Sequence, residues 1–318
     1  MLSPSSVGVR RCLGFSTFYT HLLGTTLSRT GLFLQSLRAF QAMDRALSST
    51  NRAPAIAKRS VGCSIRPVPA LRVTDLVKTY GDKRAVDGLS LLVPAGSMYG
   101  LVGPNGAGKT TTLSMATGLL RPDAGTVEVL GHDVWSDPVA AKALIGVLPD
   151  GLHVFDRLSG RELIRYVALL RGLDRRVADT RAEELLSALG LADDAELLVC
   201  DYSAGMTKKI GLACALVHAP RLLILDEPFE SVDPVSGDMI RQILKAFVTS
   251  GGTVLLSSHV MEIVEALCDS LAIVLHGRVL AAGTLDDVRQ GDSLTDRFLD
   301  VVGARHLESE SLAWLHSS

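Results

Sequence analysis

One glycine-rich segment constrains the fold of this 318-residue chain more than any other feature. Residues 103–110 read Gly-Pro-Asn-Gly-Ala-Gly-Lys-Thr; an apolar run, 98–102, precedes them, and a run that favours a helix, 109–120, follows. Strand, loop and helix in this order form a phosphate-binding loop, because small residues let main-chain N–H groups surround an oxyanion and the start of the helix faces it. The sequence therefore predicts a nucleotide site on a parallel α/β sheet.

Two polar residues at the end of this loop have expected contacts with a bound nucleotide and its metal ion. Lys109 can reach the terminal phosphates, and the Thr110 hydroxyl can bind Mg²⁺. A glycine-rich turn with a solvated lysine is the alternative, but the strand–loop–helix context favours the nucleotide site. The residues expected to bind the nucleotide are Gly103, Pro104, Asn105, Gly106, Ala107, Gly108, Lys109, Thr110 and Thr111.

Two later strands end in side chains that suit phosphate chemistry. Asp226 and Glu227 follow the apolar run 222–225, and His259 ends the run 252–259. Ligands of parallel sheets bind beyond the carboxyl ends of the strands, so we expect Asp226 to hold a metal ion and Glu227 to polarise the attacking water. His259 would contact the terminal phosphate or position the water. The position of His259 alone fits an ordinary surface histidine equally well.

Composition excludes several classes of protein. Hydrophobic residues make up 47% and charged residues 21%, which suffices for a core and excludes a wholly disordered chain. Five cysteines without a CxxC pair favour neither a zinc module nor a disulfide scaffold. Residues 1–68 carry nine basic side chains against one acid, whereas 69–318 have a formal charge of −10. An acidic body does not favour nucleic acid as a partner.

The amino-terminal residues 1–68 differ from the rest in composition. They are rich in Ser, Thr and Arg, which fits a transit-like segment, a flexible basic tail, or a start codon assigned too far upstream, with Met43 as an internal candidate. We expect this extension to be disordered and dispensable for folding. The sequence contains no apolar run of membrane-spanning length.

Alternating strand and helix patterns organise the chain after Pro67. Fully apolar strands such as 222–225 suit a parallel sheet covered on both faces. Between about 150 and 215 the periodicity is helical, with a capping-box pattern at Ser159 and Glu162 and a helix stop at Gly190. The fold class predicted is α/β, a P-loop NTPase-like parallel sheet core with an antiparallel β subdomain near the amino terminus and a helical insert.

These motifs arrive in the order of a known family, and the segment 71–285 resembles the ATP-binding subunit of an ABC transporter. Tyr80 lies 23 residues before Gly103, where the family places an aromatic residue against adenine. Residues 202–206, Tyr-Ser-Ala-Gly-Met, lie where the family has its Leu-Ser-Gly-Gly-Gln signature. His259 follows Glu227 by 32 residues and falls at the family's switch histidine.

The resemblance implies a fold, a substrate and an assembly. Two subunits would pack head to tail around two ATP molecules, with Mg²⁺, and Asp233 would lie in the loop where they touch. The signature of one subunit (Ser203, Ala204, Gly205 and Met206) would face the γ-phosphate bound by the other. Ser203 as an ordinary N-cap fits its local sequence equally well. The catalytic residues implied are Lys109, Glu227 and His259.

The sequence departs from the family pattern in three places, at four residues. Asp150 occupies the place of the glutamine that usually ends Leu-Pro-Gln, and it could ligate Mg²⁺ but cannot donate as an amide does. Ala204 and Met206 replace glycine and glutamine in the signature. Cys214 lies where arginine is frequent. None of these changes removes a catalytic group, so we expect an active ATPase.

The resemblance also predicts organisation and partners. The ATPase domain would span 69–285, with the helical insert against a separate polytopic membrane subunit, and a short tail would follow at 286–318. The second ATPase subunit would be another copy or a close paralogue, and the complex would work at the cytoplasmic face of the membrane, in the direction of export. The alternative is a soluble ABC-type ATPase acting in DNA repair or translation. A GTPase or small kinase is disfavoured, because the chain has no NKxD motif.

Overall fold

A computed structural model describes residues 68–151 and 157–303 of the chain. The predicted extension, apart from Val68, lies outside the described residues, as do 152–156 of the predicted insert and 304–318 of the predicted tail.

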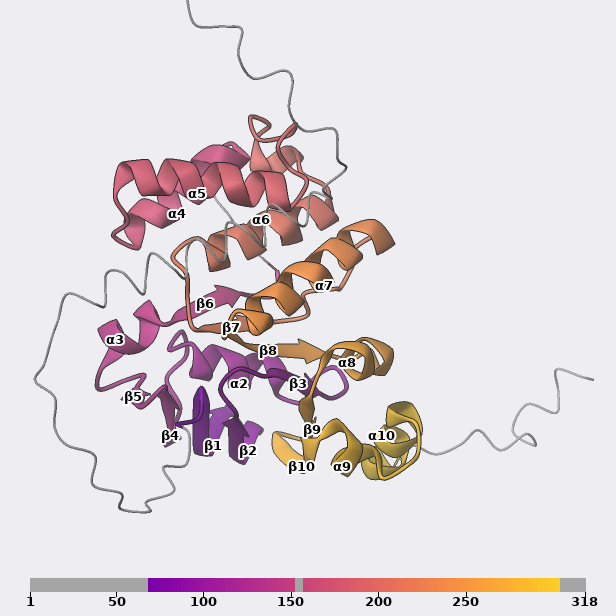
Figure 1. The fold of residues 1–318 in the computed structure, drawn as a ribbon. Helices are drawn as coiled ribbons and strands as arrows, with labels where there is room; N and C mark the ends of the chain where they lie inside the picture. The colour runs from indigo at the N-terminus through magenta and orange to yellow at the C-terminus, as the bar shows by residue number, and fades with distance from the viewer. Residues whose placement is uncertain (1–67, 152–156, 304–318) are drawn as a thin grey trace, which may run out of the picture.

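A six-stranded sheet forms the centre of the molecule, with the strand order β10-β9-β3-β8-β7-β6 (Figure 1). Five of its strands run parallel, and β10 pairs antiparallel with β9. The strands β3, β7 and β8 are buried along their whole length, as expected for a sheet covered on both faces. Their bounds are β3 Met98–Val102, β6 Ile145–Leu148, β7 Leu222–Leu225, β8 Thr253–Ser258, β9 Ser270–Leu275 and β10 Arg278–Thr284.

A second, antiparallel sheet of four strands has the order β2-β1-β4-β5. Side chains between the two sheets, with those of helix α2 (Lys109–Ala116), form one of two hydrophobic clusters. Both predicted sheets are present, so the predicted fold class is confirmed. The bounds are β1 Leu71–Tyr80, β2 Lys83–Val93, β4 Ala124–Val129 and β5 His132–Asp133.

The other hydrophobic cluster fills the space between the central sheet and most of the helices. The carboxyl-terminal helices belong to it, because Val288 and Leu294 are buried there. Helix α2 ends at Ala116, before the end of the run that favoured it, since Gly118 turns the chain with a φ of 69°. The remaining helices are α3 Pro138–Ala143, α4 Gly160–Leu170, α5 Arg175–Ala188, α6 Ala204–Leu216, α7 Pro234–Thr249, α8 Met261–Leu267, α9 Leu285–Arg289 and α10 Leu294–Val302, with a 3-10 turn at Val199–Asp201.

Helix α6 packs against the central sheet, and α4 and α5 lie beyond it on the same side (Figure 1). The capping box predicted at the start of α4 is present: the main-chain N–H of Glu162 donates to Ser159 Oγ at 3.3 Å, and that of Ser159 donates to Glu162 Oε2 at 3.0 Å. Gly190, with a φ of 62°, follows the end of α5 as predicted. These local signals were readable because each involves residues close together in the sequence.

Candidate nucleotide-binding site

A cavity of about 450 Å³ opens at the carboxyl ends of the central strands. The phosphate loop forms much of its wall, and residues from four other segments complete it. The structure thus brings together most of the residues predicted for nucleotide and catalysis. The cavity is lined by Tyr80, Lys83, Ala85, residues 104–111, Asp150, Glu227, Glu230 and His259.

The phosphate loop needs glycine for steric reasons at its two ends. A Cβ on Gly103 would lie 2.3 Å from the carbonyl oxygen of Val274. Gly108 has a φ of 105°, and a Cβ there would lie 2.5 Å from the carbonyl oxygen of Ala85. The main-chain N–H of Gly277, in the turn between β9 and β10, donates to the Ala107 carbonyl at 2.8 Å. Neighbouring strands therefore fix the shape of the loop.

Lys109 begins helix α2 and is almost completely buried. Its ammonium donates to the carbonyl of Gly103 at 2.7 Å and lies 3.4 Å from Glu227 Oε1. A buried charge needs such partners, because desolvation would otherwise make it costly. The helix N-cap is Gly108, which offers no side-chain acceptor, so the first N–H groups of α2 remain available to an anion in the cavity.

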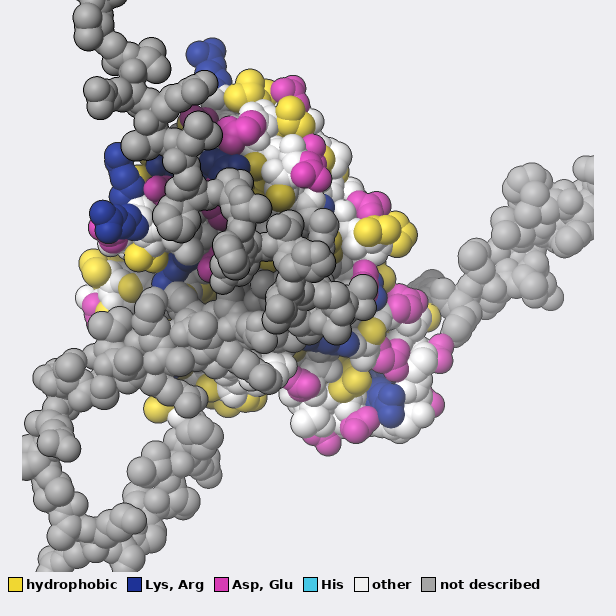
Figure 2. All heavy atoms as spheres, turned by 45° about the horizontal axis from the view of Figure 1, so that its top comes forward, with side chains coloured by type: hydrophobic (Ala, Val, Ile, Leu, Met, Phe, Trp, Pro, Cys, Tyr) yellow, Lys and Arg dark blue, Asp and Glu magenta, His cyan; other side chains and the backbone are white. Residues whose placement is uncertain are grey.

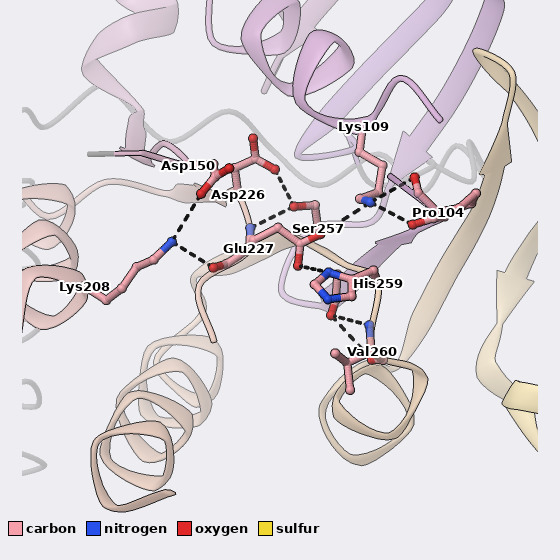
Figure 3. A network of polar contacts seen from close by, with 11 residues as sticks. Pro104, Lys109, Asp150, Lys208, Asp226, Glu227, Ser257, His259 and Val260 are labelled. Atoms are coloured by element: carbon pink, nitrogen blue, oxygen red, sulfur yellow. Dashed lines mark hydrogen bonds and ion pairs between the residues drawn. The ribbon is translucent and has the colours of Figure 1, made fainter. Parts of the chain in front are cut away.

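The carboxylate of Glu227 lies between two predicted catalytic side chains (Figure 3). Oε1 lies 3.4 Å from Lys109 Nζ, and Oε2 lies 3.1 Å from His259 Nδ1. Oε1 is buried and makes no hydrogen bond within the described part of the chain. His259 reaches this position because it directly follows β8, beside β7 in the sheet. The site thus holds a buried carboxylate oxygen whose nearest charged neighbour is the Lys109 ammonium of the phosphate loop.

Asp226 lies behind Glu227 and is held by Ser257 of strand β8. The Ser257 hydroxyl donates to Asp226 Oδ1 at 2.5 Å and accepts the main-chain N–H of Glu227 at 2.9 Å. The sequence interpretation missed Ser257. A signal existed, because Ser257 is a polar residue in a buried apolar strand, two positions before His259.

Asp150 follows β6 and reaches the same cavity, where a lysine that the sequence interpretation also missed accompanies it. Lys208, on α6, donates to the main-chain carbonyl of Glu227 at 3.0 Å and lies 3.6 Å from Asp150 Oδ1. Nothing local marks Lys208, since its contacts come from residues 58 and 19 positions away. Figure 3 shows its side chain reaching between these two acidic residues.

The predicted signature and Asp233 lie elsewhere, at the starts of α6 and α7, and are absent from the described lining of the cavity. Ser203 Oγ accepts the N–H of Met206 at 3.3 Å. Asp233 accepts the N–H groups of Ser236 and Val235, and these bonds lower the pKa of its carboxyl. A Cβ added to Gly205 would lie 3.0 Å from Asp233 Oδ2, so the two helix starts adjoin.

The chain can now be compared with known proteins. The model of the ABC transporter family matches residues 86–230. The daunorubicin/doxorubicin resistance ATP-binding protein DrrA of Streptomyces peucetius is 42% identical over 224 residues, which are 70% of this chain and 68% of DrrA. The Nod factor export ATP-binding protein I of Sinorhizobium fredii is 38% identical over 67% of this chain and 62% of its own length.

Solved structures agree with these relatives. A structure described as the ATP-binding subunit of an ABC transporter superposes with a TM-score of 0.69 at 30% identity, covering 73% of this chain and 99% of that one. A nucleotide-free ATP-binding cassette, at 22% identity and a TM-score of 0.62, shares the fold.

The fold and site define an ATP-binding cassette, and the chain belongs to the ABC transporter family. Within that family it is an ATP-hydrolysing transport subunit. In 68–151 and 157–303, no helix is both long enough and apolar enough to cross a membrane.

Proposed function

We propose that this protein is the ATPase subunit of an exporter, with two copies, or one copy and a close paralogue, enclosing ATP between them. The observation that carries the proposal is the carboxylate of Glu227, held between Lys109 and His259 at the mouth of the phosphate loop. The direction of transport follows the relatives, which are named for drug resistance and for Nod factor export.

Glu227 is the proposed general base. Its unsatisfied Oε1 can accept a proton from the water that attacks the γ-phosphate. Lys109 would leave Glu227 for the terminal phosphates when ATP enters, since the phosphate charge exceeds that of one carboxylate. His259 then remains on Oε2 and keeps the carboxylate directed at the water.

The residues around the loop fit Mg²⁺ and adenine. Mg²⁺ prefers carboxylate and hydroxyl oxygens, and Thr110, Asp226 and Asp150 are the residues that would hold it. When bound, the ion would neutralise charge on the terminal phosphates. Tyr80, at the end of β1, lines the cavity with a half-exposed ring, which suits stacking against the adenine of ATP.

The second subunit would complete the site from its signature. Ser203 and Gly205 lie at the start of α6, where main-chain N–H groups and the helix dipole favour an anion. Because this surface lies outside the cavity of its own chain, the γ-phosphate it meets would be the one bound by a second subunit. Asp233, at the adjoining start of α7, would lie at the contact between the two subunits.

The helical insert, at about 150–215, is the proposed surface for a separate polytopic membrane subunit. Three large hydrophobic side chains of α4, those of Tyr166, Leu169 and Leu170, are exposed. Figure 2 shows basic side chains gathered on one side of the molecule, with hydrophobic and acidic side chains among them. The exposed arginines where α4 and α5 meet are Arg171, Arg175 and Arg176. A patch of this composition suits a protein contact beside a membrane surface.

The proposal places the domain at 69–285, the tail at 286–318, and the complex at the cytoplasmic face of the membrane. A pulldown from detergent-solubilised membranes tests it, with ATPase assays before and after the captured partner is removed. We expect a polytopic membrane protein that changes the ATPase rate. Recovery with ribosomes or DNA and without a membrane protein would instead support the alternative, an ABC-type ATPase of translation or DNA repair.

A further inference from the structure

The backbone at Glu227 adopts a conformation that its side chain disfavours. Its φ is 46°, in the left-handed region that residues other than glycine rarely occupy. Such a residue persists only when its surroundings hold it in place. The conformation matters here because it turns the carboxylate toward Lys109 and His259.

Two side chains hold the peptide groups on either side of Glu227. Ser257, from β8, accepts the N–H of Glu227 at 2.9 Å. Lys208, from α6, donates to the carbonyl of Glu227 at 3.0 Å. Ser257 and Lys208 belong to two different elements, β8 and α6. The main chain of Glu227 is therefore held at both its N–H and its carbonyl.

Lys208 brings a positive charge to a poorly hydrated position. Its side chain is 13% exposed, and the acidic group facing it is Asp150, at 3.6 Å. A hydrogen bond from a charged donor is stronger than one from a neutral donor, and it strengthens further when water is excluded. Asp150 supplies a negative charge on the other side of this lysine.

We propose that Lys208 is a positioning residue, which fixes the left-handed main chain at Glu227 and thereby directs its carboxylate. The inference rests on the proposed role of Glu227 as general base. Helix α6 would then have two functions. Its start, at Ser203, faces the phosphate bound by the other subunit, and Lys208, one turn later, holds the base of its own subunit.

The first test measures hydrolysis and nucleotide affinity for three variants of the full chain. Lys208→Met keeps the alkyl stem and removes the donor, Lys208→Arg restores a charged donor, and Lys245→Met is the control on an exposed helix position. We expect Lys208→Met to lower kcat about 10- to 100-fold, because small displacements of a catalytic group have effects of that size. Affinity for ATP should change less than about threefold, since the loop itself is untouched.

The second test asks whether Lys208 acts through Glu227. In a Glu227→Gln background there is no base left to position, so Lys208→Met should cause no further loss of kcat. Hydrogen exchange gives a readout besides activity: amides in 226–230 should exchange faster in Lys208→Met, whereas those of 109–116 should not change. Lys208→Gln takes the place of Lys208→Met if that variant unfolds.

The outcomes separate the two proposals. Wild-type kcat in Lys208→Met, or an undiminished further loss in the Glu227→Gln background, overturns the role of Lys208. Unchanged exchange at 226–230 overturns it as well. Wild-type hydrolysis by Glu227→Gln alone would instead overturn the proposed base, whatever Lys208 does.

Discussion

The nucleotide cavity and the paired starts of α6 and α7 differ in where their polar groups find partners. In the cavity, Lys109, Glu227 and His259 come from three distant segments and face one another. At the helix starts, the hydrogen bonds described for the Ser203 and Asp233 side chains stay within their own helices. The first region is assembled by one chain, whereas the second is, in our proposal, completed by another subunit.

The largest expected effect concerns the cavity. Glu227→Gln keeps the shape of the side chain and removes the base, so kcat should fall about 10²- to 10⁴-fold. Nucleotide affinity should be retained, and the variant should accumulate as an ATP-bound dimer. Gel filtration with and without ATP, beside a steady-state ATPase assay, measures both. Rapid turnover by this variant would show that the water is activated elsewhere.

A smaller effect on kcat is expected from a substitution of Ser203, at the start of α6. Ser203→Ala should lower kcat roughly 10²-fold, as the loss of one donor to a developing anion does. Unfolding free energy should fall by only about 1 kcal/mol, the usual value of an N-cap. Denaturant unfolding measures the change in unfolding free energy, and ATPase assays on the same samples measure the change in kcat.

Ser293→Ala is the matched control, because Ser293 caps α10 with the same bond, to the N–H of Asp296 at 3.1 Å. It should lose similar stability and no activity. Equal loss of activity in the two variants would mean that Ser203 acts only as a cap.

Gly108→Ala tests how tightly neighbouring strands hold the loop. The left-handed backbone and the Ala85 carbonyl 2.5 Å from the new Cβ should together lower the unfolding free energy by about 2–3 kcal/mol. Gly131 has a φ of 88° but open space around it, so Gly131→Ala should cost about 1 kcal/mol. Calorimetry that finds equal costs would show that the backbone conformation, and not the close approach, requires glycine.

The smallest effect is a pH dependence at the start of α7. Hydrogen bonds from the N–H groups of Ser236 and Val235 lower the pKa of Asp233 below its ordinary value of 3.8. A lowered pKa means that the carboxylate stabilises the folded state above that value and loses this effect as the pH falls through the folded-state pKa. Urea unfolding of wild type and Asp233→Asn should therefore converge below pH 3.8. A constant difference at every pH would contradict the capping role.

The elements that the sequence predicted correctly are those with local signals. The phosphate loop, the capping box of α4 and the apolar strand before Asp226 each depend on neighbouring residues. Strand β6 escaped prediction because it has four residues, one of them Gly146, and takes its stability from pairing with β7. Strand β7 is equally short, but its four apolar residues form an unbroken run and were recognised.

Within the site, the sequence identified the residues proposed to contact the nucleotide but not those that support them. Asp226 and Glu227 follow a recognisable strand. Ser257 and Lys208 touch them only because β8 and α6 pack beside β7 in the folded chain. The left-handed conformation of Glu227 also had no local cause, because glutamate normally avoids it. Support of this kind is tertiary, so pattern and spacing do not reveal it.

The pairing of one chain's cavity with another chain's Ser203 can be measured directly by complementation. Lys109→Ala and Ser203→Arg subunits, each inactive alone, are expressed together with different tags, and dimers carrying both tags are purified. Each mixed dimer would contain one complete site, so we expect about half of the wild-type ATPase rate. Mixed dimers without activity would contradict a site shared between subunits.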